Sequence, residues 1–371
     1  MVVSDTRRSR HRVKGATTVA AAVTDGAGQL RVASIDISPP GRGEVAVELR
    51  GSGVCRTDLD SLRWGRPLAL GHEGAGVVRD VGPDVDLAIG QPVVLNWAMP
   101  CGRCFQCSAG RQSLCERRDD PDRLPTRPVL DAMPIGRSFN LGTMSQLTVV
   151  PNQAVVPYST HIPFPSASVV GCAVMTGYGS VVNAARVRAG SVVAVLGLGG
   201  VGLNVIQAAR LAGARRIIAL GRSEQRLEAA RRFGATDILH ITGDLGIEQV
   251  RGLTDGRGAD YAFECTGDPG LATAPLALVR NGGMAIQVSG NEVTLAVDLA
   301  LFEWDKTYLT PLYGGCRPQF DIPVILDLYA TGRLEIDALI SVTYPLEAIA
   351  DAFADMAAGR VIKAVIEFPV A

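Results

Sequence analysis

The stretch SVVAVLGLGGVGLNVIQAARLAG, residues 191–213, decides the fold of the second half of this chain. A run of β-branched and apolar residues leads into Gly197, Gly199 and Gly202, spaced as G-x-G-x-x-G, and a helical pattern follows directly. The first glycine permits a tight turn, the second lets the backbone approach a pyrophosphate, and the third allows close helix–strand packing. The new helix, starting at Gly200 and Val201, points its amino terminus at the phosphates. The stretch therefore predicts a dinucleotide site.

The sequence around this stretch alternates between strand and helix patterns. Two helical segments separate the first three of five apolar strands, which is typical of an α/β, doubly wound parallel sheet, the Rossmann arrangement. The predicted strands are residues 191–198, 214–221, 260–267, 283–290 and 306–314, and the helices are 201–213 and 223–234.

The end of the second strand suggests which dinucleotide is bound. NAD sites usually place an acid there to bind the ribose hydroxyls, but this strand ends in Gly221. Arg222 and Ser223 follow, with Arg226 one helical turn later, and guanidinium groups suit a 2′-phosphate. We therefore expect NADP, with NAD as the alternative if Arg222 is only solvated.

The first half of the chain has a different pattern of predicted secondary structure. Short β-rich runs broken by Gly and Pro predict an antiparallel, partly barrel-like domain over residues 30–150. The last fifty residues, which end in a predicted strand at 361–368, are expected to return to that domain.

Four cysteines lie within the loop PCGRCFQCSAGRQSLC, residues 100–115. Their spacing, C-x2-C-x2-C-x7-C, predicts a tetrahedral zinc site with no position left for substrate, and hence a structural role. Modest cysteine usage argues against disulfides. A balance of 36 Lys+Arg against 37 Asp+Glu argues against a nucleic-acid-binding module. The four ligands are Cys101, Cys104, Cys107 and Cys115.

Composition adds further limits. With 47% hydrophobic and 20% charged residues, the chain predicts two globular domains and no polyanionic partner. Residues 1–14 are basic and polar without an apolar core, so we expect a frayed extension and a cytoplasmic protein. Residues 162–185 and 189–207 pass a crude membrane filter, but their prolines, glycines and asparagines favour buried segments and no membrane partner.

Three further motifs extend the pattern in a fixed order. They are GVCRTD at 53–58, GHEGAGVV at 71–78 and GCAVMTGYG at 171–179. Together with the four-cysteine loop and the Rossmann unit, they make the chain resemble the zinc-dependent medium-chain alcohol dehydrogenase family, and its class I and class III members in particular. The resemblance implies a GroES-like catalytic domain at residues 1–173 and 317–371 and a Rossmann domain at 174–316.

The resemblance also implies a catalytic zinc, the second per chain. Cys55, His72 and Cys172 match its three protein ligands, a set that leaves the fourth position open. Asp58 matches the carboxylate that orients the imidazole. Glu73 matches an acid near the metal that can coordinate it transiently, and its alternative role is a buried salt-bridge partner.

A proton relay is implied as well. Thr57 matches the hydroxyl that takes the alcohol proton, and Asp60 stands where class I members carry a histidine. A carboxylate titrates about two pH units below a histidine, so the pH profile is expected to differ. The alternative is that Asp60 is a solvated turn residue.

The remaining implied residues surround the cofactor and the substrate. Arg56 and Lys363 match pyrophosphate ligands or are ordinary surface charges, and Thr176 and Val201 lie beside the nicotinamide. Trp97 and Met144 match walls of a substrate pocket, which suggests a bulky or aromatic substrate, although Trp97 alternatively fills core space.

The sequence thus predicts an alcohol dehydrogenase or aldehyde reductase that acts on small-molecule alcohols or aldehydes. A reductase of an iminium or activated C=C bond is the alternative. A homodimer through the edge strands near residues 301–312 is expected from the resemblance.

Overall fold

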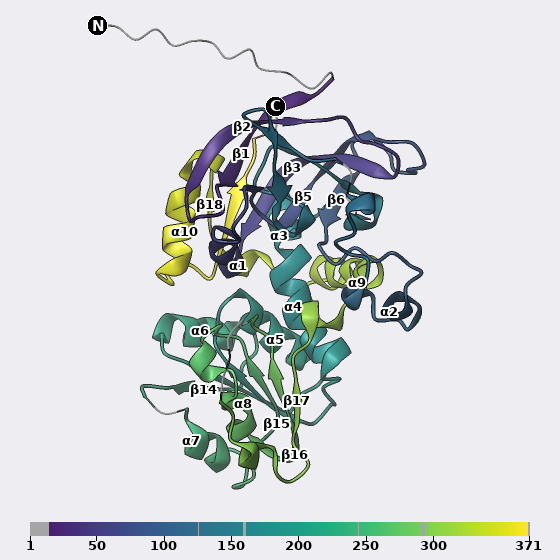
Figure 1. Ribbon diagram of the computed structural model, residues 1–371. Coiled ribbons are helices and arrows are strands. Elements are labelled where there is room, and N and C mark those ends of the chain that lie inside the picture. The colour runs from purple at the N-terminus through teal and green to yellow at the C-terminus, as the bar shows by residue number, and fades with distance from the viewer. Residues whose placement is uncertain are drawn as a thin grey trace, which may run out of the picture.

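The computed structural model describes residues 15–124, 126–158, 161–243, 245–290, 294 and 296–369. The chain forms two lobes joined by a bent helical segment (Figure 1). The predicted extension at residues 1–14 lies outside the described residues. The upper lobe in Figure 1 holds both chain ends of the described part, and the lower lobe holds the parallel sheet.

The upper lobe is built from two sheets, formed by strands of the first 160 residues and by two strands near the C-terminus. One has the order β8-β7-β2-β1-β4-β9 and the other β11-β6-β5-β3-β19-β18, with β10 also pairing with β3. Their bounds are β1 Thr17–Thr24, β2 Leu30–Ile37, β3 Glu44–Val54, β4 Leu68–Ala69, β5 Glu73–Val81, β6 Pro92–Leu95, β7 Val129–Leu130, β8 Met133–Pro134, β9 Gly136–Arg137, β10 Leu147–Pro151, β11 Val155–Pro157, β18 Ile340–Tyr344 and β19 Lys363–Glu367.

Strand β3 organises this lobe. Its apolar residues are buried because β5, β10 and β19 all pair with it in antiparallel fashion. The register shifts at Ala46/Val47 and Leu49/Gly51, and such bulges increase the local twist and help a sheet to curl. Because β19 pairs with β3, the C-terminal segment returns to the first lobe, as the sequence predicted.

The lower lobe is the predicted Rossmann sheet. Its six parallel strands have the order β14-β13-β12-β15-β16-β17, so the chain moves outward from β12 in one direction and then in the other. Ligands bind at such a reversal, outside the carboxyl ends of the strands. The strand bounds are β12 Val192–Leu196, β13 Arg216–Gly221, β14 Asp237–His240, β15 Ala259–Glu264, β16 Val279–Gln287 and β17 Thr307–Leu309.

Helices flank both lobes and link them. Those of eight or more residues are α5 Gly200–Leu211, α6 Glu224–Arg232, α9 Pro318–Ala330 and α10 Ile349–Ala357; the shorter ones are α1 Arg56–Ser61, α2 Phe105–Ser108, α3 Phe164–Val169, α4 Met175–Gly179, α7 Ile247–Gly252 and α8 Ala274–Leu278. Strands β1 and β14 and helix α7 were not among the elements predicted from the sequence.

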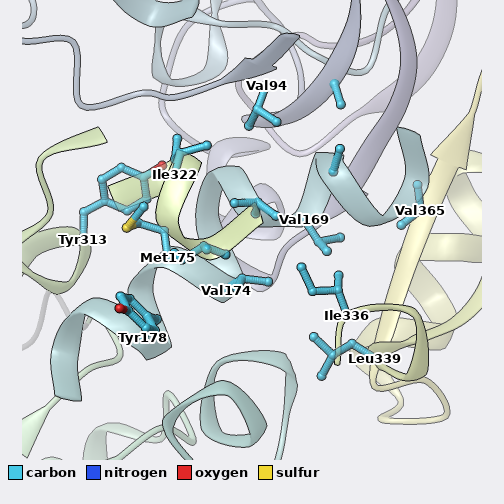
Figure 2. Close-up of a cluster of buried hydrophobic side chains, with 14 of the residues drawn as sticks. Val94, Val169, Val174, Met175, Tyr178, Tyr313, Ile322, Ile336, Leu339 and Val365 are labelled. Atoms are coloured by element: carbon cyan, nitrogen blue, oxygen red, sulfur yellow. The ribbon is translucent and has the colours of Figure 1, made fainter. Parts of the chain in front are cut away.

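The linking segment is apolar, and both lobes enclose it. Phe164–Ala184 is long and apolar enough to cross a membrane by length and composition, yet 67% of that window is buried inside the protein. Figure 2 shows Val169, Val174 and Met175 of this segment packed with Tyr313 and Ile336 from distant parts of the chain. Each fully buried side chain of this size contributes about 1.5–3 kcal/mol. The limits proposed for the domains, at 173/174 and 316/317, both fall at this junction and stay predictions.

Candidate active site

Four potential metal ligands converge where the upper lobe meets the linking segment. The ligand atoms of Cys55, His72, Glu73 and Cys172 all lie within 4.8 Å of one another. Cys55 is the N-cap of α1 at the end of β3, His72 directly precedes β5, and Cys172 lies in the π-helical turn Val170–Val174. A hydrogen bond with Cys172 holds the pKa of the Cys55 thiol well below its ordinary value, despite burial. The donor set of two thiols and an imidazole fits zinc.

Asp58 fixes the orientation of this cluster. Its Oδ1 lies 3.0 Å from Nδ1 of His72, and its Oδ2 accepts a hydrogen bond from the backbone N–H of Cys55 at 2.9 Å. One carboxylate therefore holds both predicted ligands, and it leaves Nε2 of His72 as the nitrogen available to a metal. The side chain of Asp58 is completely buried, so these contacts are shielded from water.

Glu73 takes part in two interactions at once. Its Oε1 pairs with Nζ of Lys363 at 2.6 Å, and both side chains are buried. Burial raises the pKa of Glu73 to about 7, and the Lys363 charge limits the rise. Its second oxygen, Oε2, has no hydrogen-bond partner among the described residues. An unpartnered buried carboxylate oxygen beside three metal-ligand side chains suits a nearby cation.

The glycine-rich turn has the geometry that the sequence predicted. Gly197 has φ +98°, and a Cβ there would lie 2.7 Å from the backbone nitrogen of Thr266. A Cβ on Gly202 would lie 1.9 Å from the carbonyl oxygen of Gly197, so helix α5 packs directly on the turn. A Cβ on Gly199 would meet nothing within 4 Å, because Gly199 faces an open cleft. The free backbone N–H groups at this helix start suit a pyrophosphate.

The cleft beside this turn has a volume of about 710 Å³. Most predicted cofactor residues line it, including Arg56, which is exposed, and Val201. The others are Gly197, Gly199, Gly200, Gly221, Arg222, Ser223, Arg226 and Lys363. Thr176 is half-buried in α4 and is not among the lining residues. Cys265 is half-buried and also lines the cleft.

Two of these basic residues have partners that the sequence did not predict. Lys363 was matched to the pyrophosphate, but the residue is only 5% exposed and its ammonium group is bound to Glu73. Arg226 Nη2 donates to the carbonyl oxygens of Gly359 and Val361 at 3.0 and 3.1 Å. Both side chains therefore hold parts of the protein together, and Arg222 is the exposed guanidinium at this end of the cleft.

The substrate side of the metal cluster is aromatic. The centroid of the Phe139 ring lies 4.6 Å from that of the His72 ring and 5.2 Å from that of the Trp97 ring. Trp97 is 6% exposed, lines a second cavity and contacts Tyr313 at 4.3 Å. Phe139 was missed in the sequence, since its left-handed backbone, φ 49°, gives no recognisable pattern.

Met144 does not form the second wall of the pocket. It is fully buried, its backbone nitrogen donates to the carbonyl of Leu70, and its Cγ lies 2.7 Å from where a Cβ on Gly71 would be. Met144 thus belongs to the core, and Phe139 occupies the position expected for it. Met144 lies in a bend before β10, where the sequence has no periodicity that would separate a core side chain from a pocket side chain.

The predicted relay residues lie on α1. Oγ1 of Thr57 is 3.7 Å from Sγ of Cys55, so this hydroxyl is next to the metal cluster. Asp60 is one helical turn further along, and its side chain is exposed at the surface. The position of Asp60 is compatible with proton exchange with water, and its role in the relay stays a prediction.

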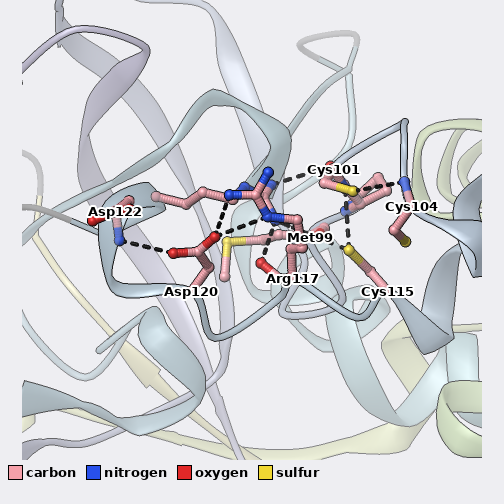
Figure 3. A network of polar contacts seen from close by, with 9 residues as sticks. Met99, Cys101, Cys104, Cys115, Arg117, Asp120 and Asp122 are labelled. Carbon is pink, nitrogen blue, oxygen red and sulfur yellow. Dashed lines mark hydrogen bonds and ion pairs between the residues drawn. The ribbon is translucent and has the colours of Figure 1, made fainter.

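The four-cysteine loop forms a second metal site, with all four sulfur atoms within 4.8 Å of one another. Backbone N–H groups point at the sulfurs: Cys101 donates to Cys115 and Cys104 donates to Cys101, at 3.2 and 3.3 Å (Figure 3). Arg123 closes the loop by donating to the carbonyls of Pro100 and Arg117. Such N–H···S contacts stabilise thiolates, so the loop fits a structural zinc ion.

Comparison with known proteins agrees with this geometry. Residues 41–161 match the family model for the alcohol dehydrogenase GroES-like domain, and residues 200–321 match that for zinc-binding dehydrogenases. An S-(hydroxymethyl)glutathione dehydrogenase of Paracoccus denitrificans is 33% identical, over 94% of this chain and 99% of that protein.

Solved structures show the same similarity. Benzyl alcohol dehydrogenase from Acinetobacter calcoaceticus matches with a TM-score of 0.86 and 28% identity, over 95% of this chain and all of that one. A putative zinc-binding dehydrogenase from Sinorhizobium meliloti 1021, bound to NADP, matches with a TM-score of 0.79 and 26% identity, over the same shares.

The chain therefore belongs to the zinc-containing medium-chain alcohol dehydrogenase family. It is an NAD(P)-dependent zinc enzyme, an oxidoreductase that acts on CH–OH groups, with a GroES-like domain and a Rossmann domain.

Proposed function

We propose that this enzyme interconverts bulky or aromatic primary alcohols and their aldehydes with NADP(H). The observation that carries the proposal is the aromatic wall formed by Trp97 and Phe139. The Phe139 ring contacts both the Trp97 ring and the imidazole of His72. A planar substrate stacks on such a wall with its hydroxyl directed at the metal cluster. The similarity to a benzyl alcohol dehydrogenase supports the same substrate class.

The protein residues divide the work between them. Cys55, His72 and Cys172 would hold a zinc ion, which would supply a Lewis acid for the substrate oxygen, and a nicotinamide in the cleft would supply the hydride chemistry. Thr57, beside Cys55, is placed to accept the alcohol proton. Phe139 and Trp97 exclude water from the reacting carbon.

Cofactor choice is the second part of the proposal. Gly221 carries no carboxylate to bind a free ribose hydroxyl or to repel a phosphate, and the exposed Arg222 lines the cleft beside it. Ser223 begins helix α6 and adds a hydroxyl and a helix start at the same place. These groups favour a 2′-phosphate.

Assembly and location complete the proposal. Strand β17 is an edge of the Rossmann sheet, and Leu299, Trp304 and Leu312 near it are 79%, 70% and 42% exposed. We propose that this edge forms a homodimer, which light scattering after gel filtration would test. We also propose a cytoplasmic location, to be tested by cell fractionation.

Initial rates with benzyl alcohol, cinnamyl alcohol and ethanol, each with NADP and NAD, test the proposed activity. Turnover of the aromatic alcohols in preference to ethanol is expected. Failure to oxidise any alcohol or to reduce any aldehyde would refute the proposal. Deuterium transfer to an iminium carbon or a C=C bond would show that the alternative reductase reaction is the real one.

A further inference from the structure

The second cavity extends beyond the aromatic wall and is strongly basic. It has a volume of about 500 Å³, and Trp97 and Phe139 form one of its walls. We call it the arginine pocket, because Arg66, Arg118, Arg127 and Arg137 line it. Asp119 is the one acidic residue among its lining residues in the described part of the chain.

One of the four arginines is neutralised within the protein. Arg118 Nη2 lies 2.7 Å from Oδ2 of Asp119, and Nδ2 of Asn140 donates to Oδ1 of the same carboxylate at 2.8 Å. These contacts hold the pKa of the Asp119 carboxyl below its ordinary value, against the effect of burial. The Arg118 guanidinium lies 5.7 Å from the centroid of the Trp97 ring. The acid of the pocket is therefore already engaged, and Arg118 supports the aromatic wall.

The other three arginines form no ion pair among the described residues, although the charge of Arg66 acts on Asp119 and that of Glu44 acts on Arg137. Arg66 and Arg127 are exposed at the pocket and form no ion pair there. Arg137 is only 7% exposed, and its Nη1 donates to the backbone carbonyl of Val149. Burial lowers the pKa of Arg137 to about 10. The negative charge of Glu44 raises this pKa and the positive charge of Arg127 lowers it. Arg137 is therefore charged at neutral pH.

The Arg137 guanidinium is buried with the carboxylate of Glu44 near enough to act on its charge, but it forms no ion pair among the described residues, so a bound anion would stabilise it further. Arg137 thus differs from an ordinary surface arginine, whose charge is solvated. Arginine presents two parallel N–H donors, a geometry that matches the two oxygens of a carboxylate. The three unpaired arginines and the aromatic wall all face the same cavity.

We propose that the arginine pocket binds a carboxylate on the substrate, so that the enzyme acts on aromatic alcohols or aldehydes that carry a carboxylate away from the reacting group. This inference rests on the proposed alcohol dehydrogenase activity and defines its substrate class. The ring lies against Trp97 and Phe139, the hydroxyl reaches the metal cluster beside His72, and the carboxylate meets Arg137, Arg127 and Arg66.

The test compares substrates that share the ring and the hydroxymethyl group and differ in the substituent opposite it. They are 4-(hydroxymethyl)benzoate, its neutral methyl ester and 4-(hydroxymethyl)phenyl phosphate, each assayed for kcat/KM. Two charge-assisted contacts, discounted for solvent exposure, should favour the carboxylate over the ester by about tenfold to a hundredfold. The preference should shrink as salt is raised, because Arg66 and Arg127 are exposed. A larger kcat/KM for the phosphate would show that the anion is a phosphate and overturn the carboxylate assignment.

Two variants and a matched control assign the effect to the pocket. The double substitution Arg66→Ala/Arg127→Ala removes exposed side chains and leaves the core intact, and Arg137→Met removes the buried charge while keeping its volume. Each should lower kcat/KM for 4-(hydroxymethyl)benzoate by about tenfold or more and change that for the methyl ester by less than about twofold. The control Arg63→Ala removes an exposed arginine that does not line the pocket, and it should change neither value.

Calorimetric titration of 4-(hydroxymethyl)benzoate into the NADPH-bound enzyme gives a readout without turnover, because an alcohol and a reduced cofactor cannot exchange a hydride. Binding weakened about tenfold in Arg66→Ala/Arg127→Ala supports the inference, even if Arg137→Met does not fold. Equal kcat/KM for acid and ester, or equal losses on both substrates in the double variant, would overturn it. An enzyme that oxidises no alcohol yet binds the benzoate through these arginines would refute the proposed function and leave the anion site standing.

Discussion

Replacing Lys363 by Met tests the buried ion pair that supports the metal site. The Nζ–Oε1 distance to Glu73 is 2.6 Å, and the two residues are 5% and 0% exposed, so the contact is hardly screened by water. Met keeps the apolar stem, which lies 3.7 Å from where a Cβ on Gly200 would be, and so preserves the packing under the glycine-rich turn. The substitution therefore removes the charge and little else.

The expected cost follows from leaving one buried charge alone. Breaking such a pair from one side costs about 3–5 kcal/mol, whereas removing both charges is close to neutral. Urea unfolding of the zinc-loaded protein, followed by fluorescence, should show this loss in Lys363→Met. The double variant Glu73→Gln/Lys363→Met should recover most of it.

The same experiment separates this role from direct cofactor binding. A pyrophosphate ligand at Lys363 would give weaker NADP binding with little change in unfolding, which is the behaviour we expect of the exposed Arg56→Ala variant. A loss of less than about 1 kcal/mol in Lys363→Met, together with weaker cofactor binding, would refute the reasoning from burial.

Three further predictions concern the cofactor and the proton relay. Arg222→Ala should lower kcat/KM for NADP by roughly tenfold and leave that for NAD nearly unchanged, since one partly exposed charge-assisted contact is lost; an unchanged ratio would mean that Arg222 is only solvated. Gly221→Asp should shift the preference toward NAD, because it restores a carboxylate that binds the ribose hydroxyls and repels a 2′-phosphate; its Cβ would lie 2.8 Å from Cδ1 of Leu198, the far end of a flexible side chain, and a retained NADP preference would count against the assigned strand end. Asp60→Ala should slow alcohol oxidation below neutral pH by roughly tenfold and Asp60→His should restore it; identical pH profiles in both variants would remove Asp60 from the relay.

Features fixed by local spacing were predictable from the sequence. The turn from Gly197 to Gly202 needs glycines for steric reasons that hold in any such unit, and the structure shows the same close contacts. The four cysteines of the loop lie within fifteen residues, so their convergence required no knowledge of the fold. Cys55, His72 and Cys172 are far apart in sequence, and only their family contexts brought them together.

Features fixed by tertiary packing were not predictable. Met144 and Phe139 are both apolar and five residues apart, and only the fold decides that Met144 fills the core while Phe139 faces the metal cluster. From the sequence alone, Lys363 is expected to be a surface charge, because its partner Glu73 is 290 residues away in the chain. Arg137 gave no signal for the same reason, because its burial and its place in the lining of the arginine pocket are not visible in the sequence.

The most direct test of the central claim is metal content measured together with alcohol oxidation. Elemental analysis of the pure protein should find two zinc ions per chain, one in each cysteine-containing cluster. Cys172→Ser should lose catalytic zinc and alcohol oxidation while keeping its circular dichroism spectrum, and Cys107→Ser should lose the other zinc and stability. One zinc ion per chain in the unmodified protein, or a Cys172→Ser variant that still oxidises alcohols, would contradict the account.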